Sequence, residues 1–249
     1  MNRQQLIDEL TAIVAIEHAL IVDNLQISYA LGTHRDDVVT PLGPASPEGR
    51  EAAGQARSIA INDMRHLKSL YEGQLMVGGR PQLGRATHVQ PLSGPVIPLC
   101  SVSAAEFATF EARQRAVAET VDARFTALAT ALPGVDPPLD SELMQRLEGA
   151  LAIAANHADR VEQLVAPIRL PGPEHHLRAK RTEATTDLER SLVAVSDEWY
   201  RTLVAMVEGW LTHDELMFDL SGRAGETMTA LDDFNAVLVG RGLIAPFHL

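Results

Sequence analysis

The stretch LTAIVAIEHALIVDNLQISYAL, residues 10–31, decides how this chain folds. Its apolar residues recur at steps of three and four, which places them on one face of an α-helix. The same spacing begins further upstream, so the pattern predicts a helix over residues 4–31. Glu17 stands in the middle of this apolar stripe, where a carboxylate is unfavourable unless it is paired, hydrogen-bonded or bound to a metal. The stripe comprises Leu6, Leu10, Ile13, Glu17, Ile21 and Asn24.

A second stretch, IAINDMRHLKSL at residues 59–70, also places polar residues on an apolar helix face. It belongs to a predicted helix over residues 49–77, which the glycines of VGGRPQLG should end. Asp63 and His66 are three residues apart and project from one face. A carboxylate oxygen and an imidazole nitrogen at this spacing can reach a single ion. An inert polar pair between the two side chains is the alternative reading.

The rest of the chain also has helical periodicity, and strand signals are scarce. Proline-rich residues 85–101 predict a long crossover rather than a tight turn. We therefore predict an all-α fold in a single domain over residues 1–249. It consists of four long helices with a crossover between the second and third, and two additional C-terminal helices. The later helices are predicted from Ser103 to about residue 128 and at 141–166, 185–212 and 223–242.

Composition excludes several classes of function. The 249 residues carry a net charge of −12, which argues against nucleic acid and anionic lipid as partners. Cys100 is the only cysteine, so the chain has neither an intramolecular disulfide nor a thiolate metal cluster. We find no apolar run of about 18 residues and no secretion signal, so a cytoplasmic protein that spans no membrane is expected.

The quoted stretches resemble a known family at this point. Residues 10–83 are similar to the ferritin-like domain of the iminophenyl-pyruvate dimer synthase type, found in violacein- and rebeccamycin-like pathways. That family has AIELEHATIP in its first helix, EEMLHL in its second and GGRP after it. The segment NDMRHL followed by GGRP is the most specific part of the likeness. Weaker similarity at VIPLCSVSAAEFATFEARQ and MTALDDFNAVLVGRGLIAPF extends it over most of the chain.

The resemblance implies a ferritin-like bundle with a buried metal site that acts on small molecules of secondary metabolism. It implies Glu17, Asp63 and His66 as metal ligands, with Asp63 in place of the family's glutamate. Two further family carboxylates are replaced by Ala123 and Val165. The family segment HYxRF corresponds to HHLRA, which retains His175 and Arg178.

A site that lacks two of the family's carboxylates suits one ion of iron, manganese or zinc. His157 lies on the stripe of the fourth predicted helix and could supply a further nitrogen, as could His175. Arg178 could anchor a substrate carboxylate.

The sequence therefore predicts an enzyme that oxidises or couples a small biosynthetic intermediate, with Glu17, Asp63 and His66 as catalytic residues and iron or manganese as cofactor. One alternative is a metal-free enzyme in which the same residues catalyse an acid–base cyclisation or isomerisation. Another is a non-catalytic bundle that binds a ligand or a partner protein. A homo-oligomer is compatible with each.

Overall fold

The computed structural model describes residues 1–32, 45–80, 83–84, 88–90, 96–98, 110–153, 157–179, 181, 183–212 and 217–243, and it is mostly helical. This confirms the all-α prediction. The long helices are α1 (Arg3–Leu31), α2 (Pro47–Met76), α4 (Phe110–Ala131), α5 (Ser141–Ile153), α6 (His157–Val165), α8 (Asp187–Thr212) and α9 (Met217–Gly240). The short elements are the antiparallel strands β1 (His88–Val89) and β2 (Ile97–Pro98), the 3₁₀ turns η1 (Leu132–Gly134) and η2 (Ala166–Ile168), and α7 (Pro173–His176).

The ends of α1 and α2 follow from their flanking residues. Asn2 caps α1 by accepting a hydrogen bond from the amide of Gln5, whose side chain accepts one from Asn2 in return. Ser46 caps α2 by accepting a hydrogen bond from the amide of Gly49 on its hydroxyl oxygen. At the far end of α2, Gly78 adopts a φ of 82°, a conformation that side chains disfavour. The amide of Gly79 then donates to the carbonyl of Gln74 over 2.8 Å, so the predicted glycine stop is confirmed.

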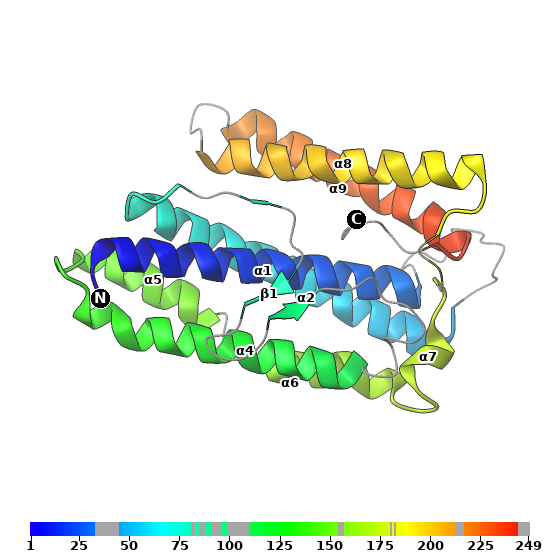
Figure 1. Ribbon diagram of the computed structural model, residues 1–249, viewed down its shortest axis with the longest axis horizontal. Coiled ribbons are helices and arrows are strands. Elements are labelled where there is room, and N and C mark those ends of the chain that lie inside the picture. Colours follow the sequence, from blue (N-terminus) through cyan, green and yellow to red (C-terminus); the bar gives the residue numbers. More distant parts are fainter. Residues whose placement is uncertain are drawn as a thin grey trace.

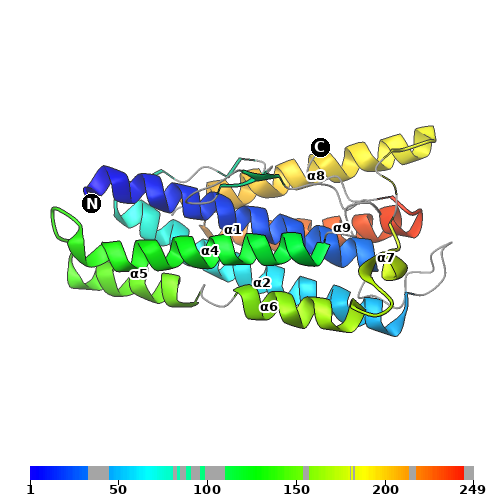
Figure 2. The same ribbon diagram turned by 60° about the horizontal axis from the view of Figure 1, so that its bottom comes forward.

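The helix directions are fixed by contacts at the start of α1. The Arg3 guanidinium donates to the Val77 carbonyl over 3.0 Å, so α2 ends where α1 begins. The amino group of Met1 donates to the Gly134 carbonyl over 3.0 Å, so α4 also ends there. Consequently α2 and α4 both run antiparallel to α1 and parallel to each other. The two views agree on this arrangement (Figures 1 and 2).

The third and fourth predicted helices differ in extent from the prediction. The structure describes the third as α4 from Phe110, and the predicted start at Ser103 lies outside the described residues. The fourth is described as two helices, α5 and α6, with residues 154–156 outside the described part. After α6 the chain reaches the far end of α1, where the Arg178 amide donates to the Ala30 carbonyl over 2.7 Å. The α5–α6 segment thus runs in the direction of α1.

The two C-terminal helices, α8 and α9, pack together and cover α1 and α2 on the side away from α4 (Figure 1). Three buried or half-buried side chains join them to the bundle. The Tyr29 hydroxyl donates to Oδ1 of Asp232 over 2.5 Å, and Arg57 donates to the same oxygen over 2.7 Å. Among the described residues, no helix is both long and apolar enough to cross a bilayer.

Candidate functional site

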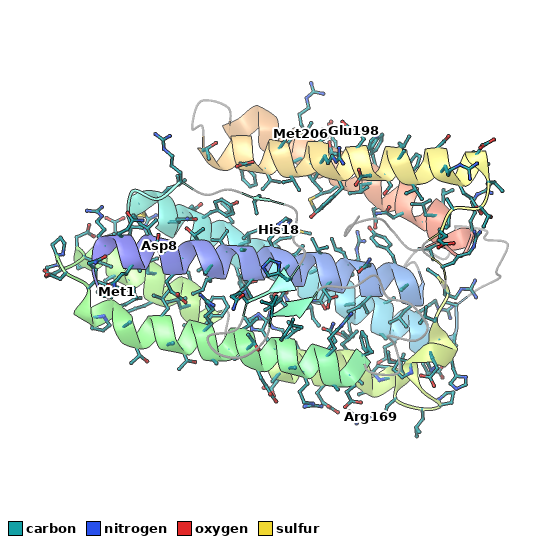
Figure 3. The ribbon with its side chains drawn as sticks, in the orientation of Figure 1. Met1, Asp8, His18, Arg169, Glu198 and Met206 are labelled. Atoms are coloured by element: carbon teal, nitrogen blue, oxygen red, sulfur yellow. The ribbon has the colours of Figure 1, made fainter. Side chains whose placement is uncertain are left out.

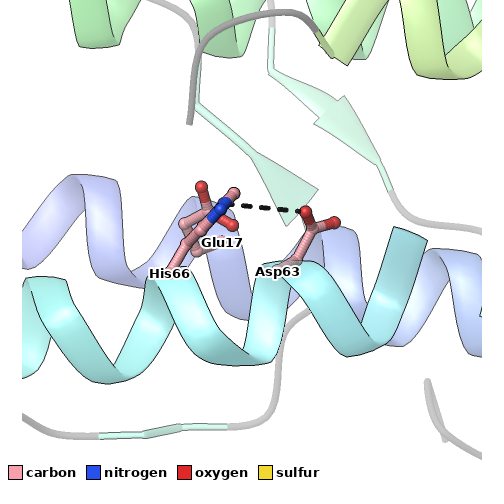
Figure 4. Close-up of side chains that lie close together, drawn as sticks. All are labelled: Glu17, Asp63 and His66. Atoms are coloured by element: carbon pink, nitrogen blue, oxygen red, sulfur yellow. Dashed lines mark ion pairs between the residues drawn. The ribbon is translucent and has the colours of Figure 1, made fainter. Parts of the chain in front are cut away.

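Three polar residues from α1 and α2 meet in the interior of the bundle. Glu17 and Asp63 have no exposed surface, and His66 is 5% exposed. One potential ligand atom from each of the three lies within 4.8 Å of those of the other two. Figure 4 shows Asp63 and His66 on one side of α2, together with Glu17 from α1. The predicted inward placement of all three side chains is confirmed. We use the term buried cluster for these three residues together with His157, which is described below.

The contact between Asp63 and His66 is not a hydrogen bond. His66 Nδ1 lies 4.0 Å from Asp63 Oδ1, well beyond hydrogen-bond distance. In the described part of the chain, Nδ1 of His66, Oδ2 of Asp63 and both carboxylate oxygens of Glu17 are buried with no hydrogen-bond partner. Buried polar atoms are nearly always satisfied, so four such atoms in one place call for an explanation.

His157, the first residue of α6, brings a second imidazole to the cluster. It is 3% exposed, and its Nε2 lies 3.8 Å from Oε1 of Glu17. Its Nδ1 lies 2.8 Å from Oδ1 of Asp122 on α4, and its backbone amide also donates to that oxygen. A carboxylate at Nδ1 favours the proton on that nitrogen, which leaves the Nε2 lone pair directed toward Glu17. Nε2 is buried and has no hydrogen-bond partner within the described residues.

Arg160, one turn further along α6, pairs with the cluster from the side. Its Nη1 lies 2.8 Å from Oδ1 of Asp63, and its side chain is 20% exposed. This ion pair satisfies one oxygen of Asp63 and leaves the other unpaired. Arg160 therefore offsets part of the negative charge that two buried carboxylates create.

Burial sets the protonation of the cluster. Burial, and then the charge of Asp63, raises the pKa of Glu17 well above its ordinary value. Burial raises the pKa of Asp63 to about 6, against the opposing charges of His157 and Arg160. Burial, with the charges of Arg160 and His157, lowers the pKa of His66 to about 4. At neutral pH His66 is thus neutral, with a lone pair to offer. The raised pKa of Glu17 favours its protonated form, and a bound cation would displace that proton.

The donor set fits a transition-metal ion. Two carboxylates and two imidazoles are hard and intermediate ligands that iron, manganese and zinc accept. The unpaired atoms are those that an ion would bind: Nδ1 of His66, Nε2 of His157 and oxygens of Glu17 and Asp63. The Arg160 guanidinium opposes a second cation nearby, so the set suits one ion better than two.

Two predicted site residues lie elsewhere. His175 belongs to α7, is exposed, and lies 3.4 Å from the Glu174 carboxylate. Arg178 follows α7 beside Ala30, which is about 20 Å along α1 from Glu17 at the helical rise of 1.5 Å per residue. The structure therefore does not bring either residue to the buried cluster.

The reading of Ala123 as the position of a lost inward carboxylate needs correction. Ala123 is exposed, so a carboxylate there would point away from the bundle. Its neighbour Asp122 is the residue of α4 that reaches the site, one step round the helix. Val165 is fully buried, as its place on the apolar stripe of the fourth helix predicts.

Asp122 and Arg160 are the functional residues that sequence reasoning missed. Neither belongs to the apolar stripe of its helix. Asp122 follows Val121 on α4, and Arg160 precedes Val161 on α6. The available signal was indirect: an inward Asp63 requires a cation, and Arg160 lies one turn after His157. Nothing in the spacing says which of the arginines on the chain meets this need.

We compared the chain with family models, with curated proteins and with solved structures, and none of them matches it. The class that the structure itself defines is an all-α protein with a buried carboxylate–histidine cluster.

Proposed function

We propose that this chain is a ferritin-like enzyme of small-molecule biosynthesis that holds one divalent iron or manganese ion in the buried cluster. One observation carries the proposal: Glu17, Asp63, His66 and His157 all present buried atoms with no hydrogen-bond partner in the described residues. Leaving such atoms unsatisfied costs about 1–3 kcal/mol each. A bound cation would satisfy all of them at once.

The order of the helices supports the ferritin-like part of the proposal. The second and third helices of the bundle, α2 and α4, are parallel, so the chain must return along the bundle between them. One long crossover of this type distinguishes ferritin-like bundles from those with short loops throughout. The sequence resemblance of residues 10–83 to such a family points the same way.

The ligand count supports one ion rather than two. Ferritin-like di-iron sites use four carboxylates and two histidines, whereas this cluster offers two of each. Ionised Glu17 and Asp63 would balance one divalent charge, and Arg160 disfavours a second. A bound iron or manganese ion would supply oxidation or oxidative coupling of a small biosynthetic intermediate. Asp122 would hold the His157 ring with Nε2 toward the site.

A second candidate is metal-free acid–base catalysis, which the Arg160–Asp63 pair favours. The guanidinium already occupies one oxygen of Asp63 over 2.8 Å. Burial and the charge of Asp63 raise the pKa of Glu17, which favours an acid at Glu17 beside a base at Asp63 in one pocket. Such a pair could move a proton during a cyclisation or isomerisation.

Metal analysis of the purified full chain separates the two candidates. Protein is made in medium supplemented with iron and manganese, and its metal content is measured by elemental mass spectrometry. We expect about one ion per chain. His66→Ala should lose the ion, whereas His175→Ala, which alters an exposed imidazole, should retain it. Folded protein that is metal-free and resists reconstitution would refute the metal site and favour acid–base catalysis.

A further inference from the structure

A cavity of about 240 Å³ lies between the α1–α2 pair and the C-terminal helices. It is bounded by α8 and α9, whereas the buried cluster is completed by α4 and α6. Figure 3 labels His18, which extends from α1 toward α8. The walls of the cavity are mostly aliphatic, and they include Ile21, Val22, Leu25, Leu203, Val204 and Val207.

The cavity is partly open to solvent, and the apolar side chains that line it lack packing partners on that side. Water gains little there, because an aliphatic wall offers it few hydrogen-bond partners. An apolar cavity of about 150 Å³ accommodates benzene, so 240 Å³ has room for roughly ten non-hydrogen atoms. The walls therefore suit the apolar body of a small molecule.

The polar groups that line the cavity indicate which polar group the small molecule carries. Lys68 is the charged residue among the lining residues described, and its ammonium lies 5.6 Å from the ring centre of Trp210. Its side chain is about half exposed, which places the ammonium at the edge of the cavity. Its partner Glu72 is 3.7 Å away and also half exposed, and such surface pairs are weak enough to be exchanged. His18 and Tyr200 instead hydrogen-bond to each other over 3.1 Å.

We propose that this cavity is a binding site for a small monocarboxylic acid with an apolar body. The apolar part occupies the space between α1 and α8, and the carboxylate pairs with Lys68 at the edge. The site is separate from the buried cluster, and the proposal does not rest on a metal or on the proposed enzymatic activity.

The test uses octanoate, which has ten non-hydrogen atoms, and 1-octanol as its uncharged match, both titrated into the full chain by calorimetry. Octanoate should bind with a negative heat-capacity change, the sign of apolar burial. Lys68→Met should weaken octanoate binding roughly fivefold, the effect of one partly exposed ion pair, and leave 1-octanol binding unchanged.

Two glycines of α9 provide a matched pair of variants. A Cβ added at either Gly225 or Gly222 meets nothing within 4 Å, so both positions accept a side chain. Gly225 lines the cavity and Gly222 is absent from the described lining. Gly225→Leu should fill the space and abolish binding of both probes, whereas Gly222→Leu should bind them as the parent chain does.

Three results would overturn the proposal. They are no heat of binding for either probe, binding that survives Gly225→Leu, and equal weakening of octanoate and 1-octanol by Lys68→Met. The first two would exclude the cavity as the site, and the third would remove the carboxylate from the ligand. Metal content of the buried cluster bears on none of them.

Discussion

The Arg160 guanidinium donates to Oδ1 of Asp63 over 2.8 Å, while Oδ2 of the same carboxylate has no hydrogen-bond partner among the described residues. Oδ1 is therefore held by a cation of the protein and also lies 4.0 Å from Nδ1 of His66, whereas Oδ2 is buried and unpaired. Asp63 can therefore act in two ways, as the ion-pair partner of Arg160 and as a ligand of a metal ion. This balance determines how substitutions around the site should behave.

Replacing Arg160 should separate these two uses. Arg160→Leu should lower the free energy of unfolding of the metal-free protein by about 3 kcal/mol, because Asp63 would remain buried without its counter-charge. The same variant should bind Mn²⁺ more tightly, since a competing cation is gone. Urea denaturation with chelator and with Mn²⁺ measures both effects. Arg146→Leu, at an exposed ion pair with Glu142, is the control and should change stability little. Equal losses in the two variants would contradict the inference.

Asp122 should affect metal binding mainly by positioning the ring of His157. Asp122→Asn removes the carboxylate that holds Nδ1, so the ring loses its fixed tautomer and orientation. Affinity for a divalent metal should fall about 10- to 100-fold, measured by competition with a chromogenic chelator. As the control, Asp159→Asn alters an exposed carboxylate on α6, the helix of His157, and should leave the affinity for metal unchanged. Unaltered affinity in Asp122→Asn would exclude His157 as a ligand that this carboxylate orients.

Two buried tyrosines should respond oppositely to loss of the hydroxyl. Tyr29→Phe removes the hydrogen bond to Asp232 that joins α1 to α9, and should cost about 1.5 kcal/mol. The Tyr71 hydroxyl is buried with no hydrogen-bond partner within the described residues, so Tyr71→Phe should be neutral or stabilising. Chemical denaturation followed by circular dichroism gives both values. An unchanged stability of Tyr29→Phe would show that Tyr29 contributes through its ring and not through the hydrogen bond to Asp232.

Acid stability should depend on Glu189 at the start of α8. Hydrogen bonds from Arg181 and from the Thr185 amide hold the pKa of Glu189 far below its ordinary value of 4.5. A carboxyl group with a depressed folded-state pKa stabilises the fold above its unfolded pKa, and this stabilisation is lost as the pH falls below about 4.5. Glu189→Gln should therefore be less stable than the parent chain at pH 7, with a smaller loss of stability between pH 5 and pH 3.

The control for that titration is Glu183→Gln, which alters an exposed carboxylate four residues before α8 begins at Asp187. Unfolding midpoints in urea, measured at half-unit steps of pH, would show the slopes. A parent chain and a Glu189→Gln variant with parallel pH profiles would rule out Glu189 as the source of the dependence.

The sequence by itself determined the helical class, the C-terminal end of α2 and the inward placement of Glu17, Asp63 and His66. These are local properties: a period of 3.6 residues fixes which side chains share a face, and a glycine with positive φ ends a helix through hydrogen bonds to its own last turn. The spacing of Asp63 and His66 likewise puts both on one side of α2 without reference to the other helices.

Only the tertiary structure decided what completes the site and what does not. His157 and Asp122 meet because α4 and α6 lie side by side, and Arg160 reaches Asp63 because α6 packs on α2. The sequence predicts His175 as a metal ligand and Arg178 as a substrate anchor, but both lie near the C-terminal end of α1, away from the buried cluster. Interhelical register is a property of packed surfaces distributed over the whole bundle, so no local spacing could have specified these contacts.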